Sequence, residues 1–206
     1  FCLRIKLIYS NLKFYLLLFF AMAFWGLSWS NAKILGDYFP PLIIMFWRFF
    51  IASIVLFPFL FHFKFTIKKL FNNIIELLGV SILLIAYNYC YFKGTYVGFA
   101  GIGGVIVTTL VPTITTILSS YIYKKVYPLN IKWGIFSGCV SGIILMNLWE
   151  FNFGFIIKSG NIYFIIGAIL WSLLTLWTQR ITTNLHILHF SYFLFLLSSI
   201  LIFVIH

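Results

Sequence analysis

The sequence is poor in charge, and poorest in acid. Asp37, Glu76 and Glu150 are its only acidic residues, and charged residues make up 8% of the 206 positions, where a soluble domain has about a quarter. Hydrophobic residues reach 63%, and the mean hydropathy is +1.10. This shortage of charge excludes an ordinary soluble domain and predicts an all-α integral membrane protein within a lipid bilayer.

Residues that would serve an enzyme or a metal centre are also few. The cysteines, Cys2, Cys90 and Cys139, are far apart and form no CxxC pair, which argues against a disulfide framework and a metal site. The histidines show no ligand spacing and are expected at helix ends or in loops: His62, His186, His189 and His206. An intramembrane enzyme needs an acid, a histidine pair or a nucleophile beside its base. We therefore expect no enzyme, no metal and no cofactor.

Long apolar runs dominate what is present. A helix needs roughly 20 apolar residues to cross a hydrocarbon layer of about 30 Å. We expect seven such transmembrane helices, at about 14–35, 41–62, 74–92, 99–123, 131–149, 161–180 and 187–205.

Positive charge is plentiful, with 14 Lys and Arg and a formal net charge of +11. These residues lie in short runs between apolar segments, which indicates membrane topology rather than nucleic-acid binding. If the N-terminus is cytoplasmic, ten of them fall in cytoplasmic segments and only Lys93 and Lys158 fall outside, while Lys33 and Arg48 lie within apolar segments. The asymmetry predicts a cytoplasmic N-terminus.

The segment 99–123 carries a face of small, weakly polar residues at helical spacing: Gly101, Gly104, Thr108, Thr115 and Ser119. Pro112 interrupts the same segment and leaves a carbonyl one turn earlier without its usual donor. Such a face suits either tight packing against another helix, or packing together with the lining of a cavity.

The segment 131–149 contains a double GxxxG motif, formed by Gly134, Gly138 and Gly142. Glycines at this spacing allow the backbones of two helices to approach closely. The motif predicts helix packing, either inside the protein or at the face of a homodimer.

Several polar or aromatic residues inside the apolar segments are candidate cavity residues. Arg48 lies about 10 Å deep at ~1.5 Å per residue, where a cation is costly. It either reaches back to the outer headgroups or contacts a substrate or Asp37. Asn88 either joins two helices or faces a cavity, since an intramembrane Asn needs a partner. Trp25 and Trp171 either pack or stack on a substrate.

The first and sixth segments resemble each other. A shift of 146 residues aligns Trp25 with Trp171. Five helices precede the sixth, so the second copy would enter the membrane from the opposite side, as in the inverted repeats of transporters. We therefore expect a first five-helix repeat at 1–149 and the start of a second at 161–206. The expected complete chain has about 290 residues and ten helices, of which seven are present here.

The chain resembles the EamA family of the drug/metabolite transporter superfamily. The matching stretches are AMAFWGLSWSNAKI, PPLIIMFWRFFIAS, AYNYCYFKGTYVGFAG, VTTLVPTITTILSSYIYKK and WGIFSGCVSGIIL, in the family's order. Lys125 occupies a place where the family often has a glutamate. The resemblance implies two five-helix inverted repeats, a cytoplasmic N-terminus and transport of small metabolites.

Together these features favour a secondary transporter that moves a small metabolite, amino acid or drug by alternating access across a bacterial inner membrane. The alternatives are an incomplete, nonfunctional fragment of such a transporter and a membrane scaffold. Pro112 is the expected kink. The expected substrate-binding residues are Trp25, Arg48, Asn88, Tyr91, Thr108, Thr115 and Trp171.

Overall fold

The computed structural model describes residues 2–62, 73–124, 126–145, 160–183 and 185–205. These residues form seven α-helices and one 3₁₀ turn, with no strand among them. The elements are α1 (Cys2–Gly36), α2 (Pro41–Leu56), η1 (Phe57–His62), α4 (Ile74–Val97), α5 (Ala100–Tyr123), α6 (Leu129–Leu145), α8 (Asn161–Ile181) and α9 (Ile187–Ile205). The expected all-α fold class is confirmed.

In the part of the chain that the structure describes, six helical segments are long and apolar enough to cross a membrane: Leu12–Gly36, Pro41–Phe61, Ile74–Val97, Ala100–Tyr123, Asn161–Ile181 and Ile187–Ile205. They correspond to six of the seven expected spans, and the integral membrane class is confirmed. The remaining helix, α6, has 17 described residues. The end of the segment expected there, 146–149, lies outside the described residues.

Prolines and glycines explain where the helices begin and end. Pro40 is extended and Pro41 begins α2, a position where the missing N–H of proline costs nothing. Pro58 cannot donate to the carbonyl one turn earlier, and the α-helix accordingly ends at Leu56 and tightens into η1. Gly98 follows α4, and Gly160, with φ of +73°, precedes α8.

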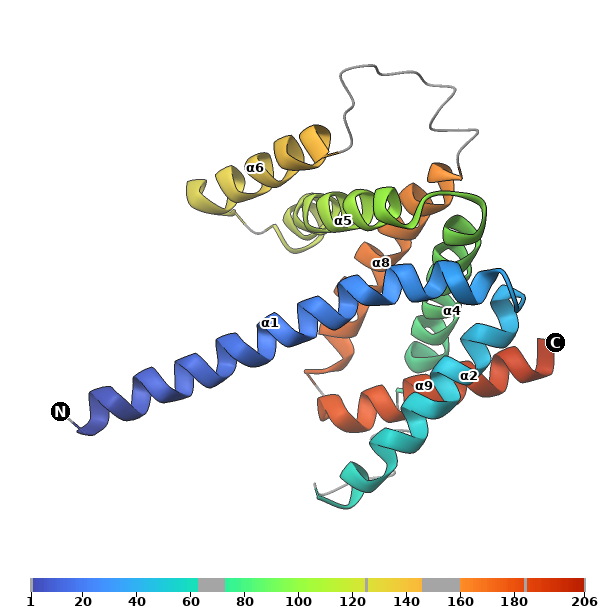
Figure 1. Ribbon diagram of the computed structural model, residues 1–206. Coiled ribbons are helices and arrows are strands. Elements are labelled where there is room, and N and C mark those ends of the chain that lie inside the picture. The colour runs from blue at the N-terminus through green and yellow to red at the C-terminus, as the bar shows by residue number, and fades with distance from the viewer. Residues whose placement is uncertain (1, 63–72, 125, 146–159, 184, 206) are drawn as a thin grey trace.

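The core lies around α4 and α8. The helix α8 packs against α4 and α5, while α2 packs against α9, and α4 also contacts α1 and α9. In Figure 1, α8 passes behind α1 and α5, and α2 crosses α9. The helices α2, α4, α5 and α8 contribute buried side chains to the core, such as Met45, Val80, Val107 and Phe164 respectively.

Residues that are far apart in the sequence contact each other at the two ends of the helices. At one end, Lys33 Nζ donates to the carbonyl oxygens of Tyr96 (2.8 Å) and Gly98 (3.3 Å). A Cβ added to Gly160 would lie 3.1 Å from the backbone nitrogen of Gly98, so the start of α8 lies there too. At the other end, His189 Nε2 is 3.3 Å from the carbonyl oxygen of Leu60. The ends of α1 and α4 thus lie with the start of α8, while the end of η1 lies with the start of α9, as expected for membrane spans that alternate in direction.

The helix α1 is largely uncovered along its first described half. Its side chains from residues 12 to 27 are exposed, and in Figure 1 this part extends away from the other helices. Such a continuous apolar surface suits contact with lipid tails.

Candidate functional site

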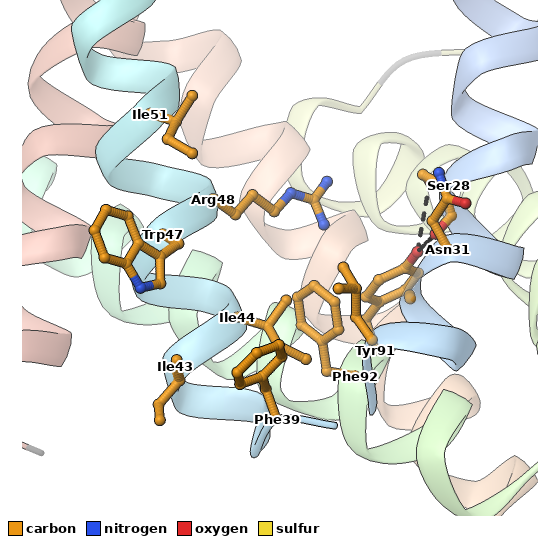
Figure 2. A pocket seen from close by; sticks show the side chains of 12 residues that line it. Ser28, Asn31, Phe39, Ile43, Ile44, Trp47, Arg48, Ile51, Tyr91 and Phe92 are labelled. Carbon is orange, nitrogen blue, oxygen red and sulfur yellow. Dashed lines mark hydrogen bonds between the residues drawn. The ribbon is translucent and has the colours of Figure 1, made fainter. Parts of the chain in front are cut away.

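The helices α1, α2 and α4 enclose a pocket of about 470 Å³, shown in Figure 2. Each of α1 and α2 contributes one face, because the lining residues recur at steps of three and four. The pocket is lined by Ser28, Asn31, Ala32, Leu35, Phe39, Ile43, Ile44, Trp47, Arg48, Ile51, Tyr91 and Phe92. The volume lies within the range of small-molecule sites.

Arg48 is the charged residue in this lining, which includes no Asp or Glu. Its guanidinium carbon lies 5.7 Å from the ring centroid of Tyr91 and 5.8 Å from that of Phe92. In Figure 2 the side chain extends from α2 toward the Tyr91 side of the pocket. The guanidinium is thus held over two aromatic faces by cation–π attraction, and no ion pair with Asp37 is formed.

Tyr91 is fixed in place by α1. Its hydroxyl donates to the carbonyl oxygen of Ser28 at 2.9 Å and lies 3.5 Å from the Ser28 hydroxyl. Its ring meets the edge of Trp29, with ring centroids 4.6 Å apart. The cation-binding face of Tyr91 is therefore oriented before any ligand arrives.

Aromatic side chains continue from this site into the core as a packed row. Trp25 contacts Trp29, and Trp29 contacts Tyr91. The ring centroids of Tyr91 and Tyr87 lie 6.3 Å apart, and those of Tyr87 and Trp171 lie 4.5 Å apart. Trp25 and Trp171 are the two ends of this row and are not among the residues that line the pocket.

Asn88 is 2% exposed and also lies outside the pocket lining. Its Nδ2 donates to the Leu84 carbonyl at 2.9 Å, while its Oδ1 has no hydrogen-bond partner among the described residues. In α5, the Thr108 hydroxyl donates to the Gly104 carbonyl at 2.8 Å, and the Thr115 hydroxyl is buried without a described partner. Asn88 and Thr115 therefore each have a buried polar atom that could form a hydrogen bond with an enclosed water molecule or with a neighbouring residue after a rearrangement.

Pro112 lies inside α5, which continues on both sides of it from Ala100 to Tyr123. The Thr116 hydroxyl donates to the Pro112 carbonyl at 2.7 Å. Pro112 is exposed and does not line the pocket.

The three glycines of the GxxxG motifs lie in different surroundings. A Cβ added to Gly142 would lie 2.6 Å from Cγ2 of Thr109, so this glycine permits close contact between α6 and α5. A Cβ added to Gly134 or Gly138 would meet nothing within 4 Å. The motif thus packs internally at one of its three positions, and a homodimer through the other two stays a prediction.

A second pocket of about 380 Å³ adjoins the first through Phe39, which lines both. Asp37, Lys93 and Tyr96 are among its lining residues. The ammonium of Lys93 lies 5.6 Å from the ring centroid of Tyr96. Asp37 is therefore placed beside this second pocket and not beside Arg48.

Of the seven substrate-binding residues expected from the sequence, Arg48 and Tyr91 line the pocket, and the structure places the other five elsewhere. Asn31 and Trp47 are lining residues that the sequence analysis missed. Asn31 had a detectable signal, because it is an amide inside an apolar segment. Trp47 had none, because a residue next to Arg48 in a helix does not share its face. The described residues contain no group of three or more His, Cys, Asp or Glu that could hold a metal ion.

Comparison with protein families gives one match. The family model described as the EamA-like transporter family matches residues 12–148. No curated protein and no solved structure matches the chain significantly.

Proposed function

The chain belongs to the EamA-like transporter family, a branch of the drug/metabolite transporter superfamily, and from this we propose that it carries a small metabolite, amino acid or drug across a bacterial inner membrane. The observation that carries the proposal is the pocket among α1, α2 and α4, which combines an apolar wall with one cation, Arg48. The matched residues include all three of these helices from residue 12 onward. Membrane carriers bind their substrates between helices in this way.

Positive charge gives the proposed orientation. A cytoplasmic N-terminus puts the end of α1 and the start of α2 on the outer side of the membrane. Ser28 and Arg48 then lie in the outer half of the bilayer, and Phe39 lies where the pocket approaches the outer surface. Alternating access would expose this pocket first to one side and then to the other, with Pro112 as the kink at which α5 changes shape.

Uptake into proteoliposomes containing the 206-residue chain tests the proposal. We expect at least one member of a panel of amino acids, small carboxylates and drugs to accumulate above the level in protein-free liposomes. Ala32→Leu should abolish that uptake, because Ala32 is 3% exposed and lines the pocket. Ala21→Leu adds the same side chain to an exposed position of the same helix and should leave uptake unchanged.

Folding of each variant is checked by gel filtration and thermal unfolding in detergent. Ser28→Leu, which fills the pocket from a half-buried position, gives a second obstruction if Ala32→Leu unfolds. Absence of uptake for every compound in the panel would contradict the proposal and favour a fragment without activity or a scaffold.

A further inference from the structure

We propose that the pocket selects molecules that carry a carboxylate next to an apolar body, with Arg48 as the residue that binds the carboxylate. This inference rests on the proposed transport function and names the class of substrate for the same site. It follows from the charge, the geometry and the shape of the lining.

Arg48 has hydrogen-bond donors available in the pocket. A guanidinium offers five N–H donors and no acceptor, and the contacts that the structure gives its carbon are the ring faces of Tyr91 and Phe92. Aromatic ring faces attract the cation, but they do not accept a pair of hydrogen bonds from its N–H groups. The two oxygens of a carboxylate do, because their spacing matches that of two guanidinium N–H donors. The side chain is therefore attracted to the rings while its N–H groups stay open to a ligand.

The protein itself supplies little negative charge that could compete for Arg48. The described acids are Asp37, which lines the second pocket, and Glu76, in the first turn of α4. The pocket lining has neither. An intramembrane cation is costly to keep uncompensated, so an anionic ligand gains more here than a neutral or cationic one.

Neighbouring charges favour the same sign of ligand. Lys93 lies beside the second pocket, and Lys33 binds the carbonyls at the end of α4. These cations lie at the end of the helices where the two pockets adjoin. Asp37 lines the same second pocket and offsets one of the two positive charges, so the three side chains leave one net positive charge near the approach to Arg48, which favours anions.

The rest of the lining fits an apolar body. Ile43, Ile44, Trp47 and Ile51 are the apolar lining residues of α2. Figure 2 shows Ile44 near Phe92, on the side of α2 toward which Arg48 extends, while Ile43 and Trp47 lie on the other side of the helix in this view. Ser28 and Asn31 are on α1, across the pocket from α2. A molecule with its carboxylate at Arg48 can therefore lay its apolar part on α2 and present a second polar group to α1.

Binding of three probes with the same phenyl-alkyl body tests the charge preference directly. They are 3-phenylpropionate, its amide and 3-phenylpropylamine, measured by titration calorimetry on the full chain in phosphatidylcholine nanodiscs, with empty nanodiscs subtracted. We expect the carboxylate to bind more than about tenfold tighter than the amide, as charge-assisted hydrogen bonds do, and the amine to bind more weakly still.

Arg48→Gln should remove the preference, leaving the carboxylate and the amide within about twofold of each other, while Arg48→Lys should retain part of it because the charge remains. Lys132→Gln is the matched control, since it removes a cation of α6 that lines neither pocket, and should keep the preference. Equal binding of the three probes to the unaltered chain, or no binding of the carboxylate, overturns the inference even where the variants fail to fold.

Failure of the inference and failure of the transport proposal are separable. Uptake of panel compounds that bind without regard to charge leaves the transport proposal standing and overturns the role of Arg48. An Arg48-dependent preference without any uptake supports the site and contradicts transport.

Discussion

The ring of Phe164 lies between two glycines of different helices. A Cβ added to Gly94 of α4 would lie 2.6 Å from this ring, and a Cβ added to Gly103 of α5 would overlap it. Phe164 itself is 1% exposed and also contacts Trp29 of α1. One aromatic side chain of α8 therefore joins three other helices, and it does so because neither glycine has a side chain.

Gly103→Ala should consequently destabilise the protein by about 1–3 kcal/mol, the usual cost of adding a methyl group to a filled core. Phe164 cannot move away, because Gly94 confines it from α4. Gly101→Ala is the matched control on the same helix, since an added Cβ there meets nothing within 4 Å, and it should be neutral or stabilising by up to about 1 kcal/mol. Free energies of unfolding in mixed detergent micelles measure both.

A double substitution tests the contact between Gly103 and Phe164. Phe164→Leu in the Gly103→Ala background should cost less than the sum of the two single changes, because the smaller side chain removes the overlap. Strict additivity, or equal effects of Ala at positions 101 and 103, would contradict this account of the packing.

Also at the scale of single residues, the sequence predicted some of the residues that line the pocket and missed others. Arg48 was predictable, because an embedded cation is costly in an apolar helix. Tyr91 was expected as well, although nothing in the sequence distinguishes it from Tyr87 and Tyr89 of the same helix; both Arg48 and Tyr91 line the pocket. Whether Trp25 or Trp171 joins them depends on which helices are neighbours, and a helix that is apolar on every side gives no sign of its neighbours. These two pack into the aromatic row instead.

At the scale of whole helices, hydropathy predicted well where each helix lies in the sequence, but it predicted less well the residues at which the helices begin and end. The span expected at 14–35 is the C-terminal part of α1, which begins at Cys2 and ends at Gly36. Hydropathy falls at Arg4, Lys6 and Lys13, yet Arg and Lys are good helix formers. Apolar runs thus indicate where a helix lies in the bilayer, while the end of the helix is decided by backbone chemistry, as Gly98 decides it for α4.

The glycines of α6 allow a test of how this helix packs. Gly142→Ala should destabilise the chain by about 1–3 kcal/mol, because the added Cβ would lie 2.6 Å from Thr109 Cγ2. Gly138→Ala, one turn away in the same motif, should have no such effect on the single chain, since its surroundings are open.

Thermal unfolding in detergent at low protein concentration measures the difference, because dilution suppresses association. Loss of stability on Gly138→Ala only at high protein concentration would identify the open glycines as a contact between copies. Loss at both concentrations would contradict the packing described here.

At the scale of the whole molecule, described residues that are far apart in the sequence meet at one end of the helices. Asp37 and Lys93 line one pocket, although 56 positions separate them in the sequence. The start of α8 contacts the same region through Gly160 and Gly98. The contacts place these residues at one end of the helices, and the positive-charge asymmetry predicts that this end lies on the outer side of the membrane.

The inverted relation between α1 and α8 can be tested by labelling their C-terminal ends. If α8 is a reversed copy of α1, the ends of the two helices lie on opposite sides of the membrane. Asp37 and Thr183 are exposed just beyond α1 and α8. In a background without Cys2, Cys90 and Cys139, Asp37→Cys should react with an impermeant maleimide added to intact cells, and Thr183→Cys should react only after the membrane is opened.

Phe99→Cys is the control for access, because Phe99 is 64% exposed and lies next to Gly98, which binds Lys33 near the end of α1. It should react as Asp37→Cys does. Reaction of positions 37 and 183 from the same side would mean that α1 and α8 enter the membrane in the same direction. The two segments would then be similar only as apolar helices are, and alternating access between reversed halves would lose its structural basis, whatever the pocket around Arg48 binds.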